Sequence, residues 1–146
     1  MNNTTEPHTA RDRFETLVPS SYEFMDQGFQ LANEAEYAQL LQGIEAHKYL
    51  TNEKIPFEIT MDDALFSWYE NVYRPVDLAI ERAGLVYDFP EATRAQLFLW
   101  VTNHWHFLKL ETGREVSAEE AAFSYGSRFG TGVFHRFLNR VKLLVA

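Results

Sequence analysis

The chain has 146 residues, no cysteine and a formal net charge of −8 at pH 7. Because 46% of its residues are hydrophobic, we expect one domain with a substantial buried core. The lack of cysteine excludes disulfides, thiolate metal sites and a cysteine nucleophile, and it favours a cytoplasmic location. The acidic balance argues against general affinity for nucleic acid. No apolar run approaches the ~20 residues that a transmembrane segment needs, and the first residues lack the layout of a signal peptide.

Residues 1–32 are expected to form an N-terminal arm. Residues 1–13 are polar and show no periodicity, so they predict a disordered or loosely held segment. Residues 14–32 contain enough apolar side chains to pack, but Pro19 and Gly28 interrupt them. Short strands and an irregular wrap over the helices are both compatible with this pattern.

Residues 33–127 form the expected helical domain, in which four segments carry local signals for a helix start. Each start has a side chain that can cap a helix, followed three residues later by an acidic or amide side chain. The expected helices run from Asn33 to about Leu50, from Thr60 to Gly84, from Thr93 to about Thr112 and from Ser117 to about Arg128. Together with a C-terminal helix, they predict a compact all-α bundle of about five helices.

The helix from Thr60 to Gly84 is the expected centre of the bundle, and Pro75 interrupts it. Inside a helix, proline lacks an N–H donor and its ring clashes with the carbonyl of Asn71, at a cost of about 3 kcal/mol. We therefore expect a kink or two short helices, with Arg74 outside the α-helical region. The kink either wraps the helix around a small core or opens an aromatic pocket. The residues considered for that pocket are His47, Trp68, Tyr69, Tyr73, Trp100 and His104.

The sequence offers little support for a catalytic or metal site. His104 and His106 are two positions apart, which places them about 200° apart around a helix and makes a shared ion difficult. Acidic residues occur in first turns of helices or beside arginines, where helix-dipole and ion-pair interactions account for them. The P-loop, nucleophile-elbow and dinucleotide-binding fingerprints do not occur. We therefore expect no metal, no cofactor and no enzymatic activity.

Residues 128–146 differ in charge from the rest of the chain. They hold four cations and no acidic residue, whereas positions 1–127 hold nine cations and all 21 acidic side chains. Apolar residues recur beside the four cations at helical spacing, which predicts a basic amphipathic helix. The expected partner-binding residues are Arg128, Phe134, Arg136, Phe137, Arg140, Val141, Lys142 and Leu144. The same apolar stripe could instead close the chain's own core.

Five short motifs occur in order between residues 43 and 113. They are H-K-Y-L at 47–50, I-P-F at 55–57, S-W-Y-E-N-V-Y-R-P at 67–75, F-P-E-A-T at 89–93 and L-F-L-W-V at 97–101. This stretch, about half the chain, resembles a bacterial helical domain of unknown function found beside ParB-like or kinase-like modules. Phe98 stands where that family has tyrosine. The resemblance implies an accessory or regulatory domain and supplies no catalytic residue.

These observations predict a non-enzymatic interaction or structural module that binds a protein partner or a second copy of itself. An acidic partner would suit the basic C-terminal helix. Two alternatives from other classes remain: a regulatory domain acting beside nucleic acid, and a small-ligand sensor that uses the aromatic pocket at Pro75.

Overall fold

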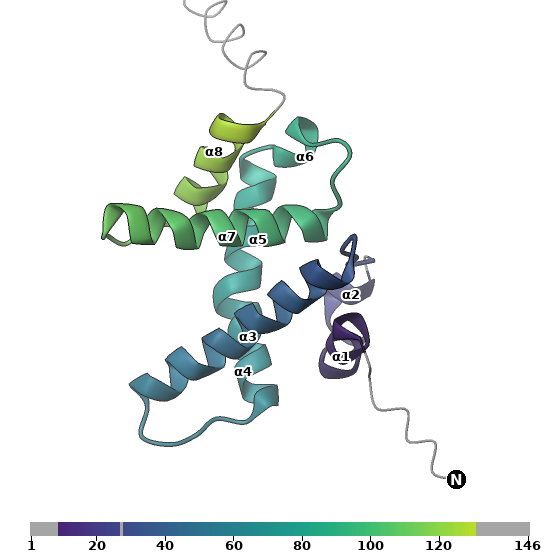
Figure 1. Cartoon of the computed structure of the whole chain (residues 1–146), viewed down its shortest axis with the longest axis vertical. Helices are drawn as coiled ribbons and strands as arrows, with labels where there is room; N and C mark the ends of the chain where they lie inside the picture. The colour runs from purple at the N-terminus through teal and green to yellow at the C-terminus, as the bar shows by residue number, and fades with distance from the viewer. Residues whose placement is uncertain (1–8, 27, 131–146) are drawn as a thin grey trace, which may run out of the picture. The chain divides into compact units, whose positions relative to one another are not determined.

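The computed structural model describes residues 9–26 and 28–130 (Figure 1). All regular structure in these residues is helical, with no strand, so the predicted all-α class is confirmed. The chain forms two compact units, the first ending at Val72 and the second beginning at Tyr73. It passes from one unit to the other within a single joined helix, residues 61–82. The domain boundaries predicted after residues 32 and 127 stay predictions.

The described residues of the first unit form four α-helices. They are α1 (Ala10–Leu17), α2 (Glu23–Asp26), α3 (Glu34–Lys54) and α4 (Met61–Trp68). The long helix α3 packs against both α1 and α4. Helix α1 begins within residues 1–13, where a disordered or loosely held segment was expected, and this expectation is wrong for residues 10–13 because Thr9 caps the helix by accepting from the backbone N–H of Asp12. The remainder of α1 and all of α2 lie where strands or an irregular wrap were considered.

Aromatic side chains build the core of the first unit. The ring of Phe14 is fully buried, with its centroid 5.5 Å from that of Phe29 and 6.0 Å from that of Tyr37. Trp68, at the end of α4, is only 2% exposed and packs edge-on against Phe24 at 6.4 Å. Burial of rings this large supplies much of the hydrophobic stabilisation of a unit of this size.

A π-helical turn, Tyr69–Tyr73, joins α4 to the helix that follows it. The extra residue in this turn places Pro75 in the first turn of α5 (Arg74–Arg82), where no N–H donor is required. The Asn71 side chain donates to the backbone carbonyl of Ser67 at 2.9 Å, an acceptor that pairs with the Asn71 N–H in a regular α-helix. The predicted interruption before Pro75 is therefore confirmed. The expectation that Arg74 leaves the helical region is wrong, because the π turn relieves the clash upstream of it.

The second unit contains α5, α6 (Leu85–Asp88), α7 (Arg94–Thr112) and α8 (Ala118–Phe129). Helices α5, α7 and α8 pack against one another in pairs (Figure 1). The small side chains of Ala121 and Ala122 are fully buried on α8, and such residues allow close approach of neighbouring helices. Leu97 and Val101 of α7 are fully buried as well.

All four predicted helix starts are confirmed. Asn33, Thr60, Thr93 and Ser117 each accept a hydrogen bond from the backbone N–H three residues later. The ends are less accurate: α3 continues to Lys54, and α8 includes Gly126 and ends at Phe129. From residue 131 onward, the predicted C-terminal helix lies outside the described residues. No described helix combines the length and apolar character that spanning a membrane requires.

Candidate functional site

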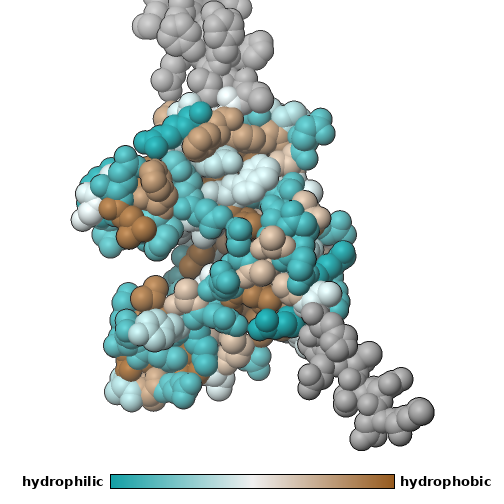
Figure 2. Space-filling view, in the orientation of Figure 1, coloured by the Kyte–Doolittle hydropathy of each residue, from teal (hydrophilic) through white to brown (hydrophobic). Residues whose placement is uncertain are grey.

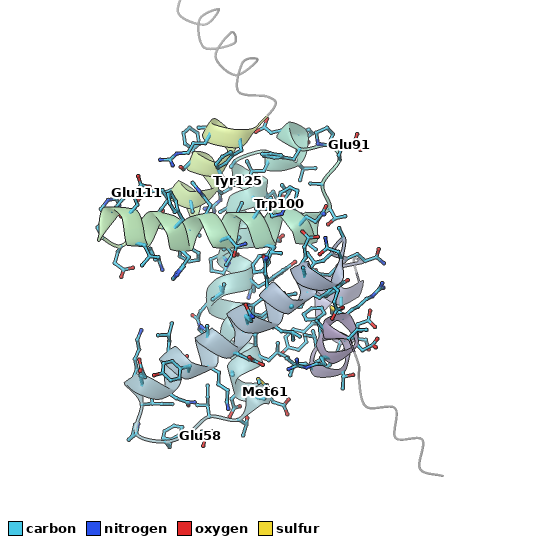
Figure 3. The ribbon with its side chains drawn as sticks, viewed as in Figure 1. Glu58, Met61, Glu91, Trp100, Glu111 and Tyr125 are labelled. Atoms are coloured by element: carbon cyan, nitrogen blue, oxygen red, sulfur yellow. The ribbon has the colours of Figure 1, made fainter. Side chains whose placement is uncertain are left out.

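An open groove of about 470 Å³ lies between α7 and α8 in the second unit. It is lined by Trp100, Asn103, His104, Phe107, Tyr125, Arg128 and Phe129. The α7 residues are spaced i, i+3, i+4 and i+7, and the α8 residues are spaced i, i+3 and i+4. Each set therefore occupies one face of its helix. Figure 3 labels Trp100 on α7 and Tyr125 on α8, and Figure 2 shows pale and brown surface over this part of the second unit.

His104 is the centre of the groove's aromatic cluster. Its ring is stacked with Phe107 at 6.0 Å and meets Tyr125 and Phe129 edge-on at 5.7 Å and 5.8 Å. His104 is 7% exposed, whereas Phe107 and Phe129 are 50% and 57% exposed. The groove thus has a buried floor and two phenylalanine rings at its rim.

Phe89 contacts two of the rings that line the groove. Its ring lies 6.3 Å from Trp100 and 5.3 Å from Tyr125. Phe89 therefore contacts one lining ring from α7 and one from α8, and this limits the movement of the aromatic floor.

The floor of the groove is uncharged near neutral pH. Burial lowers the pKa of His104, the nearby Arg128 lowers it further, and Glu111 opposes both effects. The His104 Nε2 atom lies 2.9 Å from the hydroxyl oxygen of Ser124. Burial also raises the pKa of Tyr125. The formal charge of the groove at pH 7 is therefore that of Arg128.

Gly130, the residue that follows α8, packs closely against its neighbours. A Cβ atom added there would lie 2.6 Å from the carbonyl oxygen of Gly126 and 3.2 Å from the Cβ of Asp88. Asp88, at the end of α6, is itself buried. Because a side chain at position 130 would collide with these atoms, glycine permits the close packing at the end of α8.

The residues considered for a pocket at Pro75 belong to both units. Trp100 and His104 line the α7–α8 groove. Tyr73, also in the second unit, is buried against Phe98 with ring centroids 5.0 Å apart. Of these candidates, Trp100 and His104 thus lie together in the α7–α8 groove, whereas Tyr73 belongs to the core of the second unit.

The other three candidate pocket residues lie in the first unit. Trp68 belongs to the core, and the ring of Tyr69 stacks on Phe24 at 5.4 Å. His47 on α3 has its Nε2 atom 2.8 Å from the Ser67 hydroxyl oxygen of α4. Burial, then Lys54, lower the pKa of His47. These three side chains pack within their own unit.

Of the predicted partner-binding residues, only Arg128 lies in the described part of the chain, where it lines the groove. The others, Phe134, Arg136, Phe137, Arg140, Val141, Lys142 and Leu144, lie outside it. Sequence reasoning missed the groove role of Phe107, Tyr125 and Phe129. Their helical spacing was visible, but α7 is apolar nearly all round, so spacing alone could not select its exposed face.

The described residues contain no group of three or more histidine, aspartate or glutamate side chains positioned to hold a metal ion. Comparisons with protein-family models, curated proteins and solved structures find no match to this chain. The features of this protein that bear on its function are therefore the geometry of the groove and the charge pattern of the sequence.

Proposed function

We propose that this protein is a non-enzymatic interaction module of the bacterial cytoplasm. It docks a partner protein, or a second copy of itself, through its C-terminal part from Arg128 onward. The family resemblance supports an accessory role in a larger assembly. The observation that carries the proposal is the half-exposed aromatic rim at the end of α8, directly before the basic amphipathic stretch.

The composition of the groove is typical of protein interfaces. Tryptophan, tyrosine, phenylalanine and arginine are enriched at interface centres, and all four line the groove. The rim rings of Phe107 and Phe129 retain large exposed areas that a partner would cover. An apolar surface of this kind favours association with another protein over permanent contact with water.

The charge pattern supports an acidic partner surface. The net charge is −8, but residues 131–146 contain three cations and no acidic residue. A local basic segment on an acidic protein gives specificity and faster association with an acidic surface. It also discourages contact with other basic surfaces.

Site-specific photo-cross-linking tests the proposal. We would place p-benzoylphenylalanine at Phe137 in the full chain, with the exposed Gln42 of α3 as the control site. The expected product is an adduct with another protein or a second copy at position 137 and none at position 42. Adducts found only within the same chain would contradict the proposal, because the stripe would then close the chain's own core.

The small-ligand sensor is a second candidate, with its site at the α7–α8 groove in place of the expected pocket at Pro75, and the volume of the groove favours it. About 470 Å³ lies within the roughly 300–1,000 Å³ range of small-molecule sites. Trp100 would report binding through its fluorescence, and a Trp100→Phe variant would identify the signal. A saturable response that disappears in this variant would support the sensor. A response unchanged in the variant would contradict a ligand in this groove.

A further inference from the structure

We infer that the α7–α8 groove binds a segment of a partner protein in which an aromatic or large aliphatic side chain lies next to a carboxylate. The apolar side chain would lie between the rim rings, and the carboxylate would pair with Arg128. This inference rests on the proposed interaction function and names the chemistry of the partner segment that the groove would bind.

Arg128 differs from other arginines of the second unit in its charge pairing. Arg82 pairs with Glu119, Arg94 with Asp77 at 2.8 Å, and Arg114 with Glu120 at 3.0 Å. Within residues 9–26 and 28–130, Arg128 forms no ion pair. Its guanidinium therefore remains available for a bidentate bond to an incoming carboxylate.

The neighbours of Arg128 favour an occupant that is both apolar and acidic. The rim rings of Phe107 and Phe129 are half-exposed, and the floor ring of His104 is buried and stacked against Phe107. A hydrophobic side chain would displace water from these rings. With less water in the groove, the attraction between Arg128 and a carboxylate would be screened less and would be stronger. One segment with both groups would cover the rim rings and pair with Arg128.

The charged side chains of the chain's own C-terminal residues do not match this chemistry. Residues 131–146 contain no aspartate or glutamate, and their cations Arg136, Arg140 and Lys142 would repel Arg128. At the groove, a second copy is less suitable than a separate acidic segment, since two copies each with a net charge of −8 repel one another over most of their surface. The charge complementarity therefore selects an acidic segment of a different protein.

A random-peptide phage library would be selected on the full-length protein and counter-selected on Arg128→Glu. Fluorescein-labelled synthetic copies of the enriched peptides would then be titrated by fluorescence anisotropy. We expect the enriched peptides to share an aromatic or large aliphatic residue close to Asp or Glu. Arg128→Gln and Phe129→Ser should each weaken binding at least tenfold. Arg13→Glu, an exposed charge reversal in the first unit, should leave binding unchanged.

Three results would overturn the inference: no enriched peptide, enriched peptides without a carboxylate, or equal binding to Arg128→Gln. Competition by a synthetic 131–146 peptide would assign the groove to the chain's own C-terminal part. A dimer in light scattering that Phe129→Ser dissociates would assign it to a second copy. Either of these two results also overturns the inference. Cross-linking from position 137 reports on the basic stretch, so an adduct there without peptide binding at the groove would distinguish failure of this inference from failure of the interaction function.

Discussion

Replacing Pro75 by alanine tests whether the π-helical turn removes the strain of a proline in the middle of a helix. In a continuous α-helix, alanine at this position would restore an N–H donor and remove a ring clash. Here Pro75 lies in the first turn of α5, after the π turn Tyr69–Tyr73. The substitution should therefore relieve no strain.

The two interpretations predict opposite signs for the change in the free energy of unfolding. Proline inside a helix costs about 3 kcal/mol, so a strained Pro75 would make Pro75→Ala more stable by about that amount. Proline in a compatible conformation stabilises by about 0.4–1 kcal/mol, because it restricts the unfolded chain. With the π turn in place, we expect Pro75→Ala to lose about 0.4–1 kcal/mol.

Chemical denaturation followed by circular dichroism would measure this change. Tryptophan fluorescence should be recorded in parallel, because the two units could unfold separately and only coincident transitions justify a two-state analysis. Gln42→Pro, at an exposed position in the middle of α3, is the control and should lose about 3 kcal/mol or more. A gain in stability for Pro75→Ala that approaches the cost of a mid-helix proline, about 3 kcal/mol, would refute the reasoning.

Three further predictions follow from burial, close packing and protonation. Trp68→Ala should lose about 3–5 kcal/mol in unfolding free energy, because its side chain is only 2% exposed, and a loss below about 1 kcal/mol would remove it from the core. Gly43→Ala should raise the free energy of unfolding by about 0.5–1 kcal/mol, since the position is in mid-helix and nothing lies within 4 Å of the added Cβ. Gly130→Ala should lower it by about 1–3 kcal/mol, because the added Cβ would lie 2.6 Å from the Gly126 carbonyl oxygen. A change of the same sign for both variants would contradict this reasoning. Because burial lowers the pKa of His104, the unfolded state binds more protons as pH falls through about 6.5, so stability should decrease from pH 7.5 to 5.5. His104→Gln should reduce that decrease in denaturation experiments at each pH, and an unchanged slope would exclude this histidine as a source.

The starts of the helices could be predicted because they depend on local chemistry. An oxygen on Asn33 or Thr93 lies within reach of the N–H three residues later, whatever the remainder of the chain does. Gly84 and Gly113 likewise adopt the left-handed conformation expected after a helix end. Such signals act over about one turn, so the sequence alone contains them.

The π turn and the groove could not be predicted because both depend on packing. The sequence identified strain at Pro75, but it could not choose between a kink at Arg74 and an extra residue upstream. For α7, nearly every face is apolar, so periodicity could not separate the buried Leu97 from the half-exposed Phe107. Only the position of α8 beside α7 decides which of these side chains form a groove.

The end of α8 explains why the two proposed surfaces can be tested separately. Gly130 lies close to the carbonyl of Gly126 and the side chain of Asp88, so the final turn of α8 packs tightly within the second unit. This turn contains Arg128 and Phe129, which line the groove. A substitution in the groove tests recognition by α7 and α8, and a substitution at Phe137 tests the basic stretch. If both variants lose the same partner, that partner spans the groove and the C-terminal stretch; if each loses a different one, the protein joins two partners.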